Sequence, residues 1–324
     1  MTRDWIIGLD IGGTKTAVVA GGTRGEILRR EQFPSETSRG FDDMFSRILA
    51  AIGRMAGEMQ SPPRAVSVAV GGPLDVLNGI VLSPPNLPGW SGIHLKEMLS
   101  GRLHVPVFVE HDGNAGALAE WYFGAGKGCR SIVFMTMGTG IGAGLILDGR
   151  LYRGASDVAG EIGHVRVAEE GPDCYGKSGS LEGYGSGTGL SRIARTMFPS
   201  ITSDEASPAG LREAWKQGSP RAQDVFGAAA RGLGRGLAIV ADTLNPERII
   251  LGGLGMRLWD ALVVPALRVY EREALPDARK ACRVVPAQLG ERIGDLASLC
   301  AAYDQGNFLD PVIARGAECA PKQS

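Results

Sequence analysis

Short apolar runs that end in glycine turns recur along the chain and predict β-strands. In the first part such runs cover residues 5–9, 17–20 and 66–70. Further strands are expected at 27–33, completing a meander, and at 105–110, ending at His111-Asp112. Between them, apolar side chains recur at helical spacing from Phe41 to Met55, which predicts one amphipathic helix. The resulting order, three strands followed by helix, strand, helix and strand, predicts a mixed sheet with covering helices.

The second part of the chain opens in the same way. Residues 131–137 and 143–147 predict strands, and Asp148-Gly149 predicts a hairpin turn. A helix near 222–244, a strand at 248–251 and a helix near 256–273 follow. Two halves that both begin with strand, glycine turn and strand predict a duplicated α/β unit around a cleft.

We therefore expect two α/β domains in the 324-residue chain. Residues 1–115 would form a smaller N-terminal domain, completed by a helix near 293–303. Residues 116–292 would form a larger C-terminal domain, and residues 304–324 would be a tail with little periodicity.

Composition narrows the function classes. Apolar residues make up 44% and charged residues 21%, the balance of a folded globular protein. The net charge of −1 gives no support to nucleic acid or an anionic membrane as partner. Five scattered cysteines do not form a disulfide pattern, and no stretch has the length of a signal-peptide core or a membrane span. We expect a cytoplasmic protein.

The first candidate motif runs from Asp10 to Thr16. A carboxylate at a strand end precedes two glycines, a hydroxyl and a cation. Such a turn can direct several backbone N–H groups at an anion. The spacing is not that of a Walker A loop, and a strand rather than a helix follows. The alternative is a plain hairpin turn with an incidental Asp.

A second glycine motif, Thr136 to Gly144, lies between two predicted strands. Its alternating glycines also leave room for a phosphate. A dinucleotide fingerprint requires a third glycine at the position of Ala143 and a following helix, so that interpretation is poor. A third glycine cluster, Gly252 to Gly255, follows a strand and would let an adenine ring approach the backbone. A simple strand-to-helix turn is the alternative.

Two further motifs carry acid–base or hydroxyl-binding groups. Asp112 ends a strand and begins a predicted helix, where it could accept a proton from a hydroxyl that attacks phosphorus. An N-cap role is the alternative. Glu161 and His164, with Glu182 downstream, could hold the hydroxyls of a polyol. A zinc site competes with this interpretation, but the spacing is not that of a metalloprotease helix.

In combination, the motifs resemble the ROK family of sugar kinases and sugar-sensing repressors, from about Ile6 to Ala302. The resemblance rests on residues 8–15 (Gly-Leu-Asp-Ile-Gly-Gly-Thr-Lys), 71–75 (Gly-Gly-Pro-Leu-Asp), 85–90 (Pro-Asn-Leu-Pro-Gly-Trp), 112–115 (Asp-Gly-Asn-Ala) with Glu120, 138–142 (Gly-Thr-Gly-Ile-Gly) and 160–164 (Gly-Glu-Ile-Gly-His). It implies an actin-like (ribonuclease H-like) ATPase fold in which ATP and sugar meet in the cleft between two α/β domains.

The resemblance also implies roles for individual residues. Asp112 would be the general base, and the sugar would be bound by Gly72, Asn86, His111, Asp112, Glu161, His164 and Glu182. The nucleotide would be bound by Asp10, Gly12, Gly13, Thr14, Lys15, Thr136, Gly138, Thr139, Gly140, Gly253 and Gly255. Mg²⁺ would be held through the ATP phosphates, near Asp10, and the protein would be a homodimer.

The chain departs from the family pattern in its zinc loop. Many members carry Cys-x-Cys-Gly-x-x-Gly-Cys after the Glu-x-x-His motif. Here Asp173, Tyr175 and Ser180 stand at the three cysteine positions, and Cys174 is out of register. Structural zinc needs four N or S ligands, so we expect no zinc and expect His164 to remain available to the substrate.

A second departure lies beside the predicted base. His111 stands where the family usually has an Asn whose amide binds a sugar hydroxyl. Imidazole is bulkier and can be charged near neutral pH, so glucose specificity is in question. The alternative is that His111 replaces one hydrogen-bonding group with another.

These observations predict an ATP-dependent kinase that phosphorylates a hydroxyl of a hexose or hexose-like sugar. The alternative is a catalytically silent sugar-binding sensor related to the family's repressors. Those repressors carry an N-terminal helix-turn-helix, for which this chain has no room before its first motif. The expected partners are the sugar and ATP, without nucleic acid or membrane.

Overall fold

The computed structural model describes residues 4–317, which form two compact units. Unit 1 comprises residues 1–128, 149–159 and 291–324, and unit 2 comprises residues 129–148 and 160–290. Each unit contains a mixed β-sheet with helices, so the expected α/β class is confirmed. In the described residues no helix is long and apolar enough to span a membrane.

The sheet of unit 1 has the strand order β3-β2-β1-β4-β7. Its strands are β1 (Trp5–Ile11), β2 (Lys15–Gly22), β3 (Ile27–Pro34), β4 (Val66–Val70) and β7 (Val107–His111). The first three form an antiparallel meander, whereas β1, β4 and β7 are parallel. The carboxyl ends of these three parallel strands therefore lie at one edge of the sheet.

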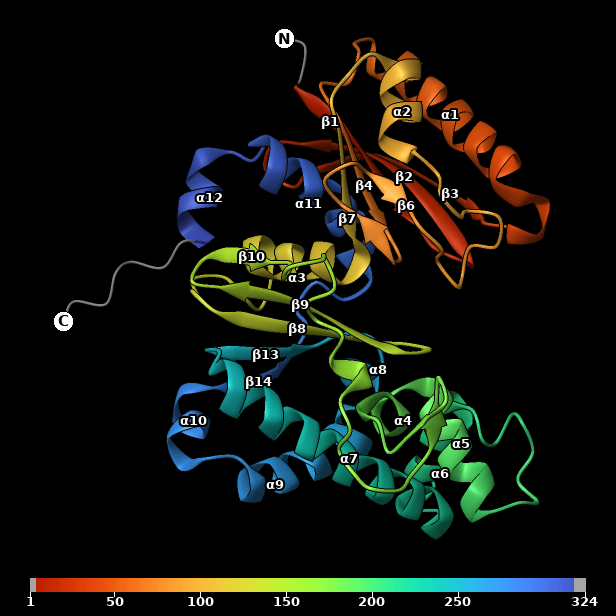
Figure 1. Cartoon of the computed structure of the whole chain (residues 1–324), viewed down its shortest axis with the longest axis vertical. Helices are drawn as coiled ribbons and strands as arrows, with labels where there is room; N and C mark the ends of the chain where they lie inside the picture. The colour runs from red at the N-terminus through yellow and green to blue at the C-terminus, as the bar shows by residue number, and fades with distance from the viewer. Residues whose placement is uncertain (1–3, 318–324) are drawn as a thin grey trace, which may run out of the picture. The chain divides into compact units, whose positions relative to one another are not determined.

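Helices cover both faces of this sheet (Figure 1). The helices of unit 1 are α1 (Gly40–Met59), α2 (Leu95–Leu103), α3 (Asp112–Phe123), α11 (Ile293–Gly306) and α12 (Pro311–Ala317). Side chains alternate along β1, so Ile7 and Leu9 join one core with α1 and α2. On the other face, a Cβ at Gly8 would lie 2.2 Å from Ser298 Oγ, so glycine there allows α11 to pack closely.

Three shorter strands complete unit 1. They are the hairpin of β5 (Leu74–Asp75) and β6 (Ile80–Val81), and β10 (Arg150–Tyr152). The expected tail from 304 contains the end of α11 and the whole of α12, and its last residues, 318–324, lie outside the described part of the chain.

Within unit 2, strands β9 (Ile141–Leu147), β8 (Ile132–Met137), β13 (Arg248–Leu251) and β14 (Arg283–Pro286) lie side by side in this order. Strands β8 and β9 are antiparallel, and β8, β13 and β14 are parallel. The pattern repeats that of unit 1, with antiparallel strands followed by parallel ones. This agrees with the duplication expected from the two glycine motifs.

The long helix α7 (Pro220–Leu244) is the centre of the helical layer of unit 2. Its glycines allow close neighbours: a Cβ at Gly232 would lie 2.1 Å from Tyr184, and one at Gly234 would lie 2.5 Å from Ala266 O. The other helices are α4 (Leu181–Gly185), α5 (Gly187–Met197), α6 (Pro208–Lys216), α8 (Leu254–Arg257), α9 (Val264–Glu273) and α10 (Pro276–Ala281). The continuous helix expected over 256–273 is instead α8, a π-helical turn (Trp259–Val263) and α9, with Pro265 in the first turn of α9.

Candidate functional site

The parallel strands of unit 1 bring three of the sequence motifs to one edge of the sheet. Asp10 lies near the end of β1, Gly71 and Gly72 follow β4, and His111 ends β7. A Cβ at Gly71 would lie 3.9 Å from Asp112 Oδ2, and one at Gly72 would lie 2.7 Å from His111 Cδ2. Residues that are up to about a hundred positions apart in the sequence thus meet at a single site.

Asp10 is the electrostatically unusual residue of this site. Burial, and to a smaller extent the nearby charge of Asp112, raise the pKa of its carboxyl from 3.8 to about 6, against a smaller opposing effect of Lys15. Helix α11 approaches closely here, since a Cβ at Gly294 would lie 2.7 Å from Asp10 Oδ2. A buried carboxylate that is destabilised in this way would gain from a bound cation, and carboxylate oxygen is a ligand that Mg²⁺ prefers.

Asp112 and His111 share the start of helix α3. The Gly113 N–H donates to Asp112 Oδ1 at 2.7 Å and to His111 Nδ1 at 3.2 Å. Nδ1 also lies 3.2 Å from Asp112 Oδ1. In the neutral tautomer whose Nδ1 accepts from Gly113, the imidazole proton is on Nε2, which is then a donor. Asp112 has 56% of its side chain exposed, whereas His111 has 25%. Asp112 thus keeps a carboxylate oxygen accessible at the strand–helix junction.

The glycine turn after β1 is compact and lies against Asn86. The Gly12 N–H donates to Lys15 O at 3.1 Å, and a Cβ at Gly13 would lie 2.5 Å from Asn86 O. Thr14 and Lys15 are exposed. The structure therefore brings Asn86 and the predicted phosphate turn together in unit 1.

Unit 2 holds the other two glycine motifs next to each other. The Gly138 N–H donates to Gly140 O at 2.9 Å, and Gly138 O accepts from Gly187 N–H at the start of α5. Gly253 has a positive φ of 57°, and a Cβ there would lie 2.2 Å from Met137 O. The two turns, one after β8 and one after β13, are thus neighbours at the carboxyl ends of parallel strands, with Thr136 on β8 and Gly255 in α8.

The Glu182 side chain contacts the glycine loop that begins at Gly138. It is buried, and its Oε2 accepts from the Ile141 N–H at 2.9 Å. A Cβ at Gly140 would lie 2.6 Å from the same oxygen. Glu161 directly precedes the 3₁₀ turn Ile162–His164, and His164 ends it. Both side chains are half-exposed, and Glu161 Oε2 lies 3.9 Å from His164 Nε2.

The residues at the family's zinc-cysteine positions all have other contacts. Asp173 Oδ1 accepts from Gly176 N–H at 3.2 Å, and Ser180 Oγ accepts from Gly183 N–H at 3.3 Å as the N-cap of α4. The Tyr175 ring lies 5.5 Å from the His164 ring. Arg192 donates to Asp173 O and to Cys174 Sγ. Among residues 4–317, no three or more His, Cys, Asp or Glu side chains lie together as a possible metal site.

Sequence reasoning left out the buried carboxylate of Glu110, which directly precedes His111. It is fully buried and accepts hydrogen bonds from Asn114, Arg153 and Gln305. A charged residue at an inward position of an apolar strand was the available signal, because such a residue requires partners.

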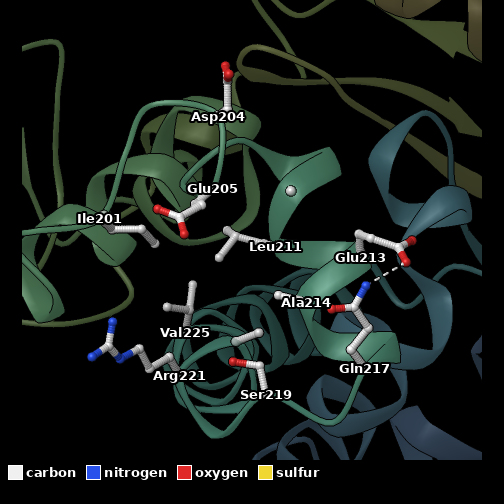
Figure 2. A pocket seen from close by; sticks show the side chains of 12 residues that line it. Ile201, Asp204, Glu205, Leu211, Glu213, Ala214, Gln217, Ser219, Arg221 and Val225 are labelled. Carbon is white, nitrogen blue, oxygen red and sulfur yellow. Dashed lines mark hydrogen bonds between the residues drawn. The ribbon is translucent and has the colours of Figure 1, made fainter.

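A separate pocket of about 400 Å³ lies in unit 2 between α6, α7 and the loop before α6 (Figure 2). Its walls include Glu205, Leu211, Glu213 and Arg221, and Gln217 donates to Glu213 at 3.1 Å. Its lining includes none of the residues that the sequence motifs indicated. The strand ends, rather than this pocket, therefore form the candidate site.

Comparisons with known proteins show the family to which the chain belongs. The family described as "ROK family" matches residues 6–301. A glucokinase of Halalkalibacterium halodurans is 32% identical over 329 residues, covering 96% of this chain and 98% of the relative. The crystal structure of a ROK hexokinase from Thermus thermophilus superposes with a TM-score of 0.81 at 30% identity, over 94% of this chain and 99% of that one. A ROK family glucokinase from Streptomyces griseus, in complex with glucose and AMPPNP, gives a TM-score of 0.75 at 31% identity, over 93% and 99%.

Proposed function

Because this chain belongs to the ROK family, we propose that it is an ATP-dependent kinase that phosphorylates a hydroxyl of a hexose or hexose-like sugar. The observation that carries the proposal is the meeting of Asp10 and Asp112 at the ends of parallel strands, beside a glycine turn with a cationic side chain. The similarity to proteins named glucokinase and to a structure with glucose and AMPPNP supports the same class.

Asp112 is the proposed general base. Its Oδ1 is occupied by the Gly113 N–H, so Oδ2 is the oxygen that would accept the proton of the attacking hydroxyl. A side chain fixed by a helix N-terminus keeps its orientation during the reaction. Phosphoryl transfer depends mostly on such positioning and on neutralisation of charge.

The glycine-rich turns of the two units are proposed to bind the nucleotide. In unit 1 these are Asp10 and the turn Gly12 to Lys15, and in unit 2 they are Thr136, Gly138 to Gly140, and Gly253 with Gly255. Asp10 fits Mg²⁺ because its carboxyl is buried and the positive charges of Lys15 and Arg30 do not offset the effect of burial on its ionisation. When bound, Mg²⁺ supplies neutralisation of the phosphate charge.

Hydroxyl-binding groups in both units are proposed to hold the sugar. They are Gly72, Asn86, His111 and Asp112 in unit 1, and Glu161, His164 and Glu182 in unit 2. His111 would present an Nε2–H donor, since the Gly113 amide occupies Nδ1. A site that pairs each buried polar group with a substrate hydroxyl rejects analogues that lack that hydroxyl.

We also propose that the loop of residues 171–180 folds without zinc, because its polar side chains hydrogen-bond to backbone groups of the loop and its neighbours. A homodimer and a cytoplasmic location complete the proposal. Light scattering tests the homodimer, for which a mass of one chain, 34.1 kDa, would be the opposing result.

The direct test is ADP release with Mg-ATP against hexoses, N-acetylhexosamines and cyclitols, with Asp112→Ala as the control. We expect turnover on at least one compound and its loss in the variant. Binding of a sugar by calorimetry without any turnover would instead favour the sugar-sensor alternative.

A further inference from the structure

Glu110 is a fully buried carboxylate one residue before His111 and two before the proposed base. Its Oε1 accepts from the backbone N–H of His111 at 3.0 Å and from Asn114 Nδ2 at 2.9 Å. One oxygen therefore joins the last residue of β7 to the first turn of α3. Asp112 lies between these two attachment points.

The other oxygen of Glu110 is held by Arg153. Arg153 donates to Glu110 Oε2 from Nε at 2.9 Å and from Nη2 at 2.7 Å, and Nη2 also donates to Asp304 Oδ2 at 2.9 Å. Gln305 donates to the same Glu110 oxygen at 3.3 Å. Burial by itself lowers the pKa of Arg153, but the two carboxylates outweigh it and raise this pKa.

The network draws on three segments that are distant in sequence. Glu110 ends β7, Arg153 lies in the segment 149–159 directly after β10, and Asp304 and Gln305 lie in α11. All three belong to unit 1. A buried carboxylate needs such partners, because an unpaired buried charge is strongly destabilising. A general need for charge pairing does not explain why the other oxygen, Oε1, accepts from groups on both sides of Asp112.

We propose that Glu110, oriented by Arg153 and Asp304, is a positioning residue that holds the β7–α3 junction and thereby aims Asp112 and His111. The inference rests on the proposed function of Asp112 as base. Glu110 itself touches neither the substrate nor the nucleotide in this account. Its effect on the reaction passes through the His111 amide and the Asn114 side chain.

Arg153→Lys is the decisive variant. Lysine keeps the positive charge but cannot reproduce the forked N–H geometry, so the carboxylate of Glu110 shifts without losing its counter-charge. We expect kcat to fall about tenfold or more at a KM for ATP within about twofold of wild type, since small misplacements of reacting groups cost up to about 10²-fold. Arg24→Lys is the matched control, because Arg24 forms an exposed ion pair with Asp310 in the same unit.

A second readout does not depend on turnover. In ¹⁵N spectra of the imidazoles, the Nδ1 signal of His111 should move in Arg153→Lys, while the signal of the exposed His94 stays in place. A folded Arg153→Lys variant with kcat within about twofold of wild type and an unshifted His111 signal would overturn the proposal. If the Arg153→Lys variant regains its kcat on cooling to the same extent as it regains folded protein, the loss reflects unfolding. The network would then have only a structural role.

If Arg153→Lys does not fold, Asp304→Asn takes its place, because it alters the bond from Arg153 Nη2 to Asp304 and keeps both partners of the Glu110–Arg153 contact. The same pair of readouts applies, with a smaller kcat loss expected. If wild type shows no turnover on any sugar, the proposed kinase function fails. The positioning role of Glu110 is then decided by the His111 signal alone, and an unshifted signal rejects it.

Discussion

Asp10 and Asp112 lie at the ends of two parallel strands, and the charge of Asp112 opposes the ionisation of Asp10. Burial and the charge of Asp112 together raise the pKa of Asp10 from 3.8 to about 6. Lys15, in the turn that follows β1, offsets only part of this effect. Two acidic groups held together in this way, next to glycine turns, are characteristic of a site that receives a cation.

The raised pKa of Asp10 predicts a pH-dependent cost to the fold. The folded state favours the protonated carboxyl, so its stability should fall as pH rises from about 4 through about 6. Asp10→Asn removes the ionisation. Relative to wild type it should gain about 2 kcal/mol in free energy of unfolding between pH 4 and pH 7, at about 1.36 kcal/mol per pKa unit. Urea denaturation at the two pH values measures this, and an equal difference at both would contradict it.

His111→Asn should change sugar selectivity without much change in stability. Asparagine is a good N-cap and can still accept from the Gly113 N–H, so the free energy of unfolding should change by less than about 1 kcal/mol. The Nε2–H donor is lost, and the ratio of kcat/KM values between sugars should shift about tenfold or more. The control is His94→Asn, at the N-cap of α2, where no side-chain cap bond exists. Unchanged ratios in His111→Asn would exclude a role in selectivity.

The loop of residues 171–180 should not depend on zinc. Asp173 and Ser180 accept backbone N–H groups, and Tyr175 packs on His164, so chelation removes nothing from the fold. We expect a Tm unchanged by EDTA and substoichiometric zinc by atomic absorption. Arg192→Met, in contrast, should lower the Tm because Arg192 binds Asp173 O and Cys174 Sγ. One zinc per chain, with a lower Tm after chelation, would refute the zinc-free loop.

Gly253→Ala should destabilise unit 2 and weaken ATP binding. A Cβ there would meet Met137 O at 2.2 Å, next to the glycine loop that begins at Gly138. We expect a loss of about 1–3 kcal/mol from overpacking, beyond the cost of the positive φ. Gly218→Ala separates the two effects, because Gly218 has a φ of 79° but no atom within 4 Å of its Cβ position. Equal losses in the two variants would mean that the contact with Met137 has no importance.

The strands that carry the motifs were predictable from sequence because their apolar runs end in glycine or, for β7, in His111-Asp112. Strand β14 (Arg283–Pro286) was not, since four residues with an arginine and a proline give no periodicity. The π-helical turn at Trp259–Val263 was missed because the apolar spacing continues through it into α9. Local pattern alone does not report such a change in helix type.

The sequence motifs predicted Asp10 and Asp112 as site residues, but not the effect of the Asp112 charge on the pKa of Asp10. It depends on the register that sets β1 beside β4 and β4 beside β7. The Arg153–Glu110 contact spans 43 positions, and the Asp304–Arg153 contact spans 151. Such long-range pairs follow from topology, which the sequence pattern alone does not determine.

The most direct test of the proposed function is the turnover of Asp112→Asn, with sugar affinity measured by calorimetry on the same sample. The variant keeps the size of the side chain and an oxygen that can accept from Gly113, but not the basicity. If Asp112 is the general base, kcat should fall about 10²- to 10⁴-fold while the sugar Kd stays within about threefold. Turnover within about threefold of wild type would contradict the assignment of Asp112 as the base and the mechanism built on it.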